Sequence, residues 1–258
     1  MRLTRCYIDA PLAAGDFVPL SESATVHLTR VLRLGLGSRI VLFNGDGCDY
    51  DAELSSLEKK SARAEVLAAR AVNTESPLRL VLAQSVARGE KMDFVLQKAT
   101  ELGVSGIVPL VTERTEVRLD AERGEKRRTH WQGVIASACE QSGRARLPAL
   151  GHVATLSNWL GGPPLSGLDA RDDTATQRLP LFYLDPEAEA SLRDLPEAAH
   201  NGACFVIGPE GGLGERDLAQ LRAAGALGLQ LGPRVLRTET AGLALLAAMQ
   251  ALYGDFAR

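Results

Sequence analysis

The sequence predicts an α/β protein in which a mainly parallel sheet, covered by helices, follows a smaller β-rich module. Two patterns indicate this. From about residue 78 onward, short apolar runs alternate with longer amphipathic stretches. The first 72 residues hold only short runs between turn residues, with Asn44-Gly45-Asp46-Gly47 as the clearest hairpin signal. Because 258 residues can form two cores, we divide the chain into domains at 1–72 and 73–258.

The amino-terminal module is expected to contain strands with one short helix among them. Runs suited to strands cover residues 5–8, 39–43, 50–54 and 62–67, and a helix is expected near 25–32. Residues 71–77 read AVNTESP, which is the composition of a linker. The module is therefore expected to end before the apolar run that begins at Leu78.

The larger module is expected to alternate strands and helices. Strands are expected at 78–83, 107–110 and 179–184, and helices at 91–102, 125–142 and 187–195. In the first of these helices, apolar residues recur at the spacing of one helical face, and Gly103 ends the helix. Residues 161–178 contain few side chains that could enter a core, so a loop is expected there.

Two glycine turns near the carboxy terminus predict a ligand site. The apolar run 205–207 stops at the glycine turn 208–212, and Gly214 can cap the helix expected at 215–224. A second apolar run reaches Gly232-Pro233, and Thr238 or Thr240 is expected to cap the last helix. Glycine permits positive φ and brings backbone amides close to a ligand, although the same turns could serve packing alone. The dinucleotide and phosphate-loop fingerprints are absent from the sequence, which disfavours a nicotinamide or ATP site.

Composition narrows the class of protein. The net charge of −3 gives no sign, for the surface as a whole, that the protein binds a polyanion. Residues 123–146 hold six cations against two carboxylates, for which a solvated helix face is the simpler interpretation. Four scattered cysteines without a C-x-x-C pair predict a cytoplasmic protein with no metal site. The charged amino terminus and the lack of a long apolar run predict no secretory signal and no membrane segment.

Seven motifs, read together, carry a family resemblance. They are HLTRVLRLGLG and NGDG in the first module, followed by KMDFVLQKATELGV, PLVTERTEV, ACEQSGR, VIGPEGGL and LGPRVLRTETA. Each motif alone is weak, but their order and spacing along nearly the whole chain resemble the ribosomal RNA small subunit methyltransferase E family of the SPOUT superfamily. This resemblance implies a PUA-like β-barrel followed by a methyltransferase domain with a carboxy-terminal trefoil knot. Periodicity could not have revealed a knot.

The resemblance also implies an activity, which is methylation of N3 of a uridine in 16S ribosomal RNA with S-adenosylmethionine. Since uridine N3 carries a proton, Glu239 is the candidate base or orienting group and Arg237 the candidate charge stabiliser, with Glu210 as the competing carboxylate. Alternatively, Glu239 only complements the helix dipole and Arg237 forms a salt bridge. The implied cofactor-binding residues are Leu184, Ile207, Gly208, Pro209, Glu210, Gly211, Gly212, Leu231, Gly232, Leu236 and Thr238.

The implied partner is 16S ribosomal RNA, within the small ribosomal subunit. RNA contacts are expected mainly at phosphates, and the residues that match the family's positions are Arg5, His27, Arg30, Arg33 and Arg144. For His27 the alternative is an ordinary surface histidine. In light of the resemblance, the cations between residues 123 and 146 gain weight as an RNA-facing strip. The last helix has little polar circumference, so the core or a second subunit must cover most of its sides, and we infer a homodimer.

Two other functions stay open at this point. One is methylation of the ribose 2′-hydroxyl or of another RNA position, and the other is RNA binding by a PUA-like protein without turnover. The intact motifs at 208–212 and 231–241 argue against the second. Two positions depart from the family pattern, because Gly214 stands where the family often has serine or threonine and Thr115 where it often has serine. Neither change undermines the resemblance, since glycine tolerates a cap position and threonine keeps a hydroxyl.

Overall fold

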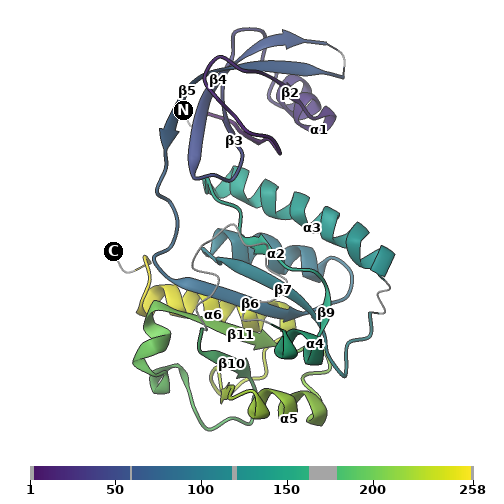
Figure 1. The fold of residues 1–258 in the computed structure, drawn as a ribbon, viewed down its shortest axis with the longest axis vertical. Coiled ribbons are helices and arrows are strands. Elements are labelled where there is room, and N and C mark those ends of the chain that lie inside the picture. The colour runs from purple at the N-terminus through teal and green to yellow at the C-terminus, as the bar shows by residue number, and fades with distance from the viewer. Residues whose placement is uncertain (1–2, 59, 118–120, 163–178, 257–258) are drawn as a thin grey trace. The chain divides into compact units, whose positions relative to one another are not determined.

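The chain forms two compact units (Figure 1). The structure, a computed structural model, describes residues 3–58, 60–117, 121–162 and 179–256. The first unit comprises Met1–Glu75 together with Ala136–Leu147, and the second comprises Ser76–Ile135 together with Pro148–Arg258. The chain therefore passes between the units three times. The predicted domains 1–72 and 73–258 stay a prediction, and the structure adds that a later segment packs with the first unit.

The first unit is built around a curled five-stranded sheet with the order β1-β3-β4-β5-β2. Its two edge strands pair differently, because β1 is parallel to β3 whereas β2 is antiparallel to β5. Alternate residues such as Ile40, Leu42 and Leu54 are almost fully buried and form its core. The strands are β1 (Arg5–Tyr7), β2 (Phe17–Leu20), β3 (Arg39–Phe43), β4 (Cys48–Leu57) and β5 (Ala62–Ala71).

The β3–β4 hairpin lies at the predicted turn, with Gly45 and Gly47 at positive φ. β2, by contrast, was not predicted from the sequence. The helix expected near 25–32 is split into α1 (Glu22–Val26), capped by the Ser21 side chain, and a π-helical turn at His27–Val31. The helical stretch ends before Arg33, whose φ of 55° lies in the left-handed region.

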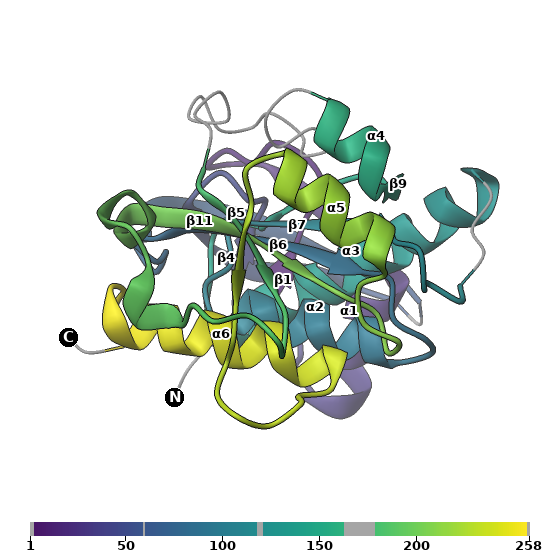
Figure 2. The same ribbon diagram turned by 90° about the horizontal axis from the view of Figure 1, so that it is seen from below.

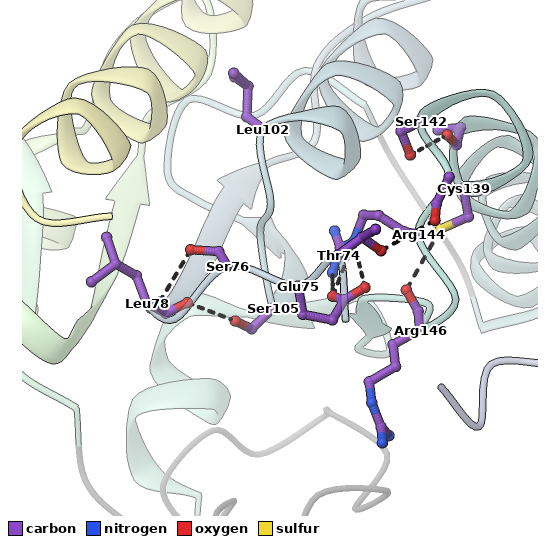
Figure 3. Close-up of polar contacts among 12 residues, drawn as sticks. Thr74, Glu75, Ser76, Leu78, Leu102, Ser105, Cys139, Ser142, Arg144 and Arg146 are labelled. Carbon is purple, nitrogen blue, oxygen red and sulfur yellow. Dashed lines mark hydrogen bonds and ion pairs between the residues drawn. The ribbon is translucent and has the colours of Figure 1, made fainter. Parts of the chain in front are cut away.

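The segment 136–147 is fixed to the first unit by hydrogen bonds to widely separated parts of it. The Tyr7 N–H donates to Glu140 Oε1 at 2.9 Å, and the Thr74 hydroxyl donates to the Gly143 carbonyl at 3.1 Å. The guanidinium of Arg144 forms a buried ion pair with Glu75 (Figure 3). The unit is thus completed by residues that lie far along the chain.

The second unit contains a parallel sheet with the order β12-β10-β11-β6-β7-β8, and β9 also pairs with β7. Every recorded strand pair in this sheet is parallel, as the alternating pattern predicted. Its strands are β6 (Arg79–Ser85), β7 (Gly106–Val111), β8 (Ala149–Leu150), β9 (Ala154–Thr155), β10 (Leu181–Leu184), β11 (Gly202–Ile207) and β12 (Leu227–Leu229). The short strands β8 and β9 were not predicted.

Helices cover both faces of the parallel sheet, with α2 and α6 on one face and α4 and α5 on the other (Figure 2). Gly242 allows α6 to approach β6 and β11, because a Cβ atom there would lie 3.1 Å from Leu82 and 3.4 Å from Ile207. These helices are α2 (Lys91–Glu101), α4 (Leu156–Gly161), α5 (Glu215–Ala223) and α6 (Thr238–Leu252), whereas α3 (Ala121–Ser142) begins in the second unit and ends in the first. The α/β class is therefore confirmed, with a mainly parallel sheet in one unit and a curled β-sheet in the other.

One helix prediction is wrong. Residues 187–195 do not form a continuous helix but turns followed by a short 3₁₀ helix, Leu192–Asp194. Asp185 Oδ1 accepts the Glu187 N–H at 2.9 Å, and the Ala190 carbonyl accepts the Gln230 N–H, so the backbone groups are used outside a helix. Most of the loop expected at 161–178 lies outside the described residues, since only 161 and 162 are included.

Candidate active site

A cavity of about 1200 Å³ opens in the second unit where β10, β11 and β12 end. Carboxyl ends of parallel strands meet at one edge of a sheet, and the connections that follow them can enclose a ligand there. Both glycine turns line this cavity, together with the connection that follows β10 and the beginning of α6. The fold thus brings together two segments that are about twenty residues apart.

Ten of the eleven predicted cofactor-binding residues line the cavity, and both predicted catalytic residues do so as well. The exception is Gly211, whose carbonyl accepts a hydrogen bond at 2.9 Å from Arg114, a residue that lines the cavity itself. The ten are Leu184, Ile207, Gly208, Pro209, Glu210, Gly212, Leu231, Gly232, Leu236 and Thr238. This placement is geometric, and their binding roles stay predictions.

The first glycine turn is tightly folded and needs glycine at two positions. A Cβ atom on Gly208 would lie 2.9 Å from the backbone nitrogen of Leu213. Gly212 has a φ of 72°, which favours glycine, and its N–H donates to the Pro209 carbonyl at 2.9 Å. A side chain at either position would strain the turn, so the sequence there is dictated by backbone geometry.

The second turn leaves its backbone available. Among the described residues, the segment 231–236 makes no backbone hydrogen bond to another part of the protein. Unpaired N–H and C=O groups beside a cavity need water or a ligand as partners. Apolar side chains of Leu231 and Leu236 line the same cavity. The backbone of this segment can therefore form hydrogen bonds with the polar edge of a flat ligand, while its leucine side chains pack against the apolar face of that ligand.

A buried relay of hydrogen bonds joins the beginning of α6 to the first glycine turn. The Thr238 hydroxyl donates to the Gly208 carbonyl at 2.6 Å and accepts from Gln84 Nε2 at 2.9 Å. Gln84 Nε2 also donates to the Ser85 carbonyl at 3.0 Å, so both of its N–H groups are used. The prediction that Thr238 or Thr240 caps α6 is wrong, because the cap position is Arg237 and the Thr238 side chain points to the turn instead.

Three charged side chains meet on the cavity wall. Lys91 Nζ lies 3.3 Å from Glu210 Oε1 and 3.6 Å from Glu239 Oε2. Burial acts to raise the pKa of Glu210, but hydrogen bonds from the backbone N–H groups of Glu210 and Arg88, together with Lys91, hold it below its ordinary value. Glu239 Oε2 is buried and accepts no hydrogen bond from any described residue. Arg237 is exposed on the same cavity, and among the described residues it forms no salt bridge.

Sequence reasoning missed Lys91, Gln84 and Arg114 as parts of this site. All three lie at or just after the carboxyl ends of β6 and β7, which face the same edge as β11. The rule that strand ends converge could have found them from the predicted strands alone. The polar residues at those strand ends were the available signal.

The predicted RNA-binding residues, all in the first unit, fall into two groups. His27, Arg30 and Arg33 are exposed on or next to the π-helical turn. Arg5 and Arg144, by contrast, are buried with only 9% and 5% of their surface exposed. Arg5 pairs with Asp49, lies over the Phe43 ring and donates to the Arg144 carbonyl. In this conformation these two guanidinium groups support the unit from inside and do not present themselves to phosphate.

Three general features of the chain bear on its chemistry. The four cysteines are free thiols, and burial raises the pKa of Cys204 to about 12. Within the described residues there is no cluster of acidic, histidine or cysteine side chains suited to a metal ion. Nor does any helix in that part of the chain have the length and apolar character to cross a bilayer.

Comparison with known proteins decides the family. A family model described as an RNA methyltransferase domain matches residues 74–250, and a model described as an RNA methyltransferase PUA domain matches residues 20–67. The ribosomal RNA small subunit methyltransferase E of Bacillus subtilis is 30% identical over 228 residues, covering 86% of this chain and 85% of the relative. The chain belongs to the ribosomal RNA small subunit methyltransferase E family.

Two solved structures that resemble this chain carry a cofactor. The methyltransferase E of Neisseria gonorrhoeae, bound to S-adenosylmethionine, is 38% identical with a TM-score of 0.86, covering 99% of this chain and all of that one. A Legionella pneumophila protein with bound S-adenosylmethionine is 36% identical with a TM-score of 0.87 and the same coverage. Family membership makes the chain an RNA methyltransferase, as the motifs predicted.

Proposed function

We propose that this chain transfers a methyl group from S-adenosylmethionine to N3 of a uridine in 16S ribosomal RNA. One observation carries the proposal, namely that both glycine turns and the candidate pair Arg237 and Glu239 lie on one cavity. The methyltransferase E names of the relatives and the cofactor in two solved structures support the reaction class. The proposal adds the target atom, which those names do not state.

The residues around the cavity fit S-adenosylmethionine. Its adenine has a polar edge and a flat apolar face, which suit the unpaired backbone at 231–236 and the side chains of Leu231 and Leu236. Its cationic sulfonium suits a wall that carries the carboxylates of Glu210 and Glu239. A cavity of about 1200 Å³ is larger than a typical small-molecule pocket, which leaves room for a nucleotide beside the cofactor.

The chain's own residues must prepare uridine N3. The bound cofactor supplies an activated methyl group on its sulfonium. Glu239 is proposed to accept the N3 proton, because it lines the cavity and its Oε2 accepts no hydrogen bond from the described residues. Arg237 is proposed to stabilise the negative charge that then spreads onto the uracil oxygens. Since N3 lies on the pairing edge, the uridine must be unpaired or rotated outward.

Substrate recognition is proposed to use the first unit. His27, Arg30 and Arg33 are exposed close together in sequence, where they can contact phosphate. Arg5 and Arg144 are buried and paired, so they are proposed to stabilise the unit that carries these three exposed residues. The proposed substrate is 16S ribosomal RNA within the small subunit, and the proposed location is the cytoplasm.

A homodimer is part of the proposal. Along α6, Leu243, Ala244, Ala247 and Ala248 are half-buried, and Leu252 is 55% exposed, so one apolar side of the helix is incompletely covered. A second copy of the chain would remove this surface from water. Light scattering during size-exclusion chromatography is expected to give about twice the 27.5 kDa mass of one chain. A monomer at micromolar concentration would contradict this part of the proposal.

The reaction is tested by incubating the chain with S-adenosylmethionine and small ribosomal subunits that lack the modification. Mass spectrometry of the nucleosides is expected to show N3-methyluridine, and a 2′-O-methyl product would overturn the proposal. Arg237→Ala is expected to slow transfer about 100-fold while cofactor binding, measured by calorimetry, stays unchanged. The matched control is Arg216→Ala, an exposed arginine on α5 that does not line the cavity.

A further inference from the structure

Lys91 is the first residue of α2, and its ammonium group lies between two carboxylates from other parts of the chain. Glu210 belongs to the first glycine turn, and Glu239 lies in the first turn of α6. All three side chains are at least partly buried, with 35% of Lys91, 31% of Glu210 and 17% of Glu239 exposed. The Lys91 ammonium group is therefore paired with two carboxylates, which belong to different segments of the chain.

Two carboxylates within 3.6 Å of one nitrogen would repel each other without it. Glu210 has additional support, because its Oε1 also accepts the Arg88 N–H at 3.1 Å. Glu239 Oε2 has no hydrogen bond from the described residues, and Lys91 is the cation paired with it there. The loss of Lys91 would consequently affect Glu239 more than Glu210.

We propose that Lys91 is a positioning residue, which holds the carboxylates of Glu210 and Glu239 together on the cavity wall. The inference rests on the proposed function, in which Glu239 accepts a proton. Lys91 holds that carboxylate in place on the cavity wall, and it ties the first glycine turn to the beginnings of α2 and α6.

Other charged groups surround the three residues. Arg88 is paired with Glu116, and Arg114 donates to the Gly211 carbonyl, so both are already engaged. Arg237 lines the same cavity next to Glu239. On the remaining side, Asp93 of α2 pairs with His130 at 2.7 Å. The charged residues next to Lys91 in the chain are Arg88, Glu90 and Asp93. Those that line the same cavity, besides Glu210 and Glu239, are Arg114, Asp185, Glu187, Glu189, Glu215, Arg222, Arg234 and Arg237.

The decisive variant is Lys91→Met, which keeps the length of the side chain but removes its charge. The structure offers a matched control on the same helix, because Lys98 pairs with Glu101 at 2.8 Å and is 36% exposed. Lys98→Met removes a similar charge away from the cavity. Lys91→Arg restores the charge and should rescue the variant's behaviour. Circular dichroism and thermal unfolding verify that each variant is folded.

The first measurement needs no cofactor or RNA. Carboxyl carbons of glutamate are titrated by ¹³C NMR in the isolated protein. In Lys91→Met the pKa of Glu210 is expected to rise, because the Lys91 charge and hydrogen bond that lower it are gone. In Lys98→Met and Lys91→Arg it should stay as in the wild type. An unchanged Glu210 titration in a folded Lys91→Met variant would overturn the inference.

The second measurement is the pH dependence of methyl transfer under single-turnover conditions. Lys91→Met should lose about tenfold more rate at pH 5.5 than at pH 8, relative to wild type, because the Glu210 carboxylate beside Glu239 becomes protonated more readily without the Lys91 charge. An equal loss at both pH values would mean a merely structural role and would also overturn the inference. A product other than N3-methyluridine would refute the proposed target while leaving both the titration and the pH comparison valid for Lys91.

Discussion

At the scale of single residues, Thr238 has the most consequential position. Its hydroxyl is the link between Gln84, at the end of β6, and the carbonyl of Gly208. Thr238 is only 5% exposed, and Gln84 is fully buried. Because hydroxyl and amide groups in such positions are costly to leave unpaired, the relay constrains how the two turns lie against each other.

Replacing Thr238 with valine should destabilise the protein without changing side-chain shape. Thr238→Val leaves one Gln84 N–H and the Gly208 carbonyl without their partner, so the free energy of unfolding is expected to fall by about 2 kcal/mol. Thr240→Val, two residues further along α6 and exposed, should change it by less than about 0.5 kcal/mol. Urea unfolding measures both, and equal losses would show that the relay contributes nothing specific.

Glu140 predicts a pH dependence of stability in the first unit. Burial raises the pKa of this carboxyl, although the Tyr7 N–H and the charges on His27 and Arg5 act to lower it. Because the folded-state pKa of Glu140 is raised, its carboxyl group stabilises the folded protein fully below the ordinary pKa of 4.5. This contribution to the free energy of unfolding is lost as the pH rises through the folded pKa.

Glu140→Gln should remove this loss, because an amide oxygen can still accept the Tyr7 N–H but cannot ionise. The variant is expected to match wild type near pH 4 and to be more stable than wild type at pH 7, as measured by urea unfolding at both pH values. Glu22→Gln is the control, since that carboxylate is 62% exposed. A variant less stable than wild type at pH 7 would contradict the prediction.

The role of a residue could be predicted from the sequence where it depends on the place of that residue along the backbone. It could not be predicted where it depends on a side chain that lies far away in the sequence. Arg237 and Glu239 follow a strand end, so their place on the cavity was predictable. Arg5 was predicted as a phosphate contact, but the carboxylate that pairs with it, Asp49, is 44 residues away. No pattern in a single sequence reveals such pairings, and the same is true of Arg144 with Glu75.

At the scale of elements, the beginning of α5 explains an unusual glycine. Glu113 reaches across from the segment after β7, and its Oε2 accepts the Arg216 N–H at 3.1 Å. A Cβ atom on Gly214 would lie 2.1 Å from that same oxygen. The carboxylate therefore takes the place that a serine or threonine cap would occupy, which accounts for the glycine at position 214.

A double-mutant cycle tests this exchange of caps. Glu113→Ala should cost about 1 kcal/mol of unfolding free energy, because α5 loses a capping acceptor. Gly214→Ser should be unfavourable in the wild type, where Glu113 must move, but should restore stability in the Glu113→Ala background. Additive effects of the two substitutions in urea unfolding would contradict the idea that they share one site.

Elements with strong periodicity were predicted closely, and those that depend on local side-chain bonds were not. α2 was expected at 91–102 and runs Lys91–Glu101, while β3 matches its predicted span 39–43. The helix expected at 187–195 failed because Asp185 and Gln230 take its backbone groups. β2 was missed because it has only four residues and contains Pro19, which argues against a strand in a sequence pattern.

At the scale of the whole molecule, the first unit is not a continuous piece of chain. Its residues 1–75 are completed by 136–147, which supply the acceptor for the Tyr7 N–H and the partner of Glu75. A fragment 1–75 is expected to unfold less cooperatively and at lower temperature than the same fragment joined by a glycine-serine linker to 136–147. Thermal circular dichroism compares the two, and indistinguishable transitions would show that the later segment is dispensable.

The overall architecture followed from sequence only in part. The parallel sheet was predictable, because alternating strands and helices leave few other arrangements. The return of residues 136–147 to the first unit was not, since a helix pattern does not reveal which side of a boundary its end joins. A knot is likewise a property of how segments pass each other, so the trefoil implied by the family resemblance stays a prediction.

The divided first unit also affects how the protein is made. The chain is synthesised from its amino terminus, so residues 1–75 leave the ribosome well before the segment that completes their unit. At 5–20 residues per second, synthesis of the chain up to residue 147 takes roughly 4 to 14 s longer. During this interval Arg5 and Glu75 lack their later partners. The first unit therefore stays incomplete while residues 76–135 of the second unit are translated.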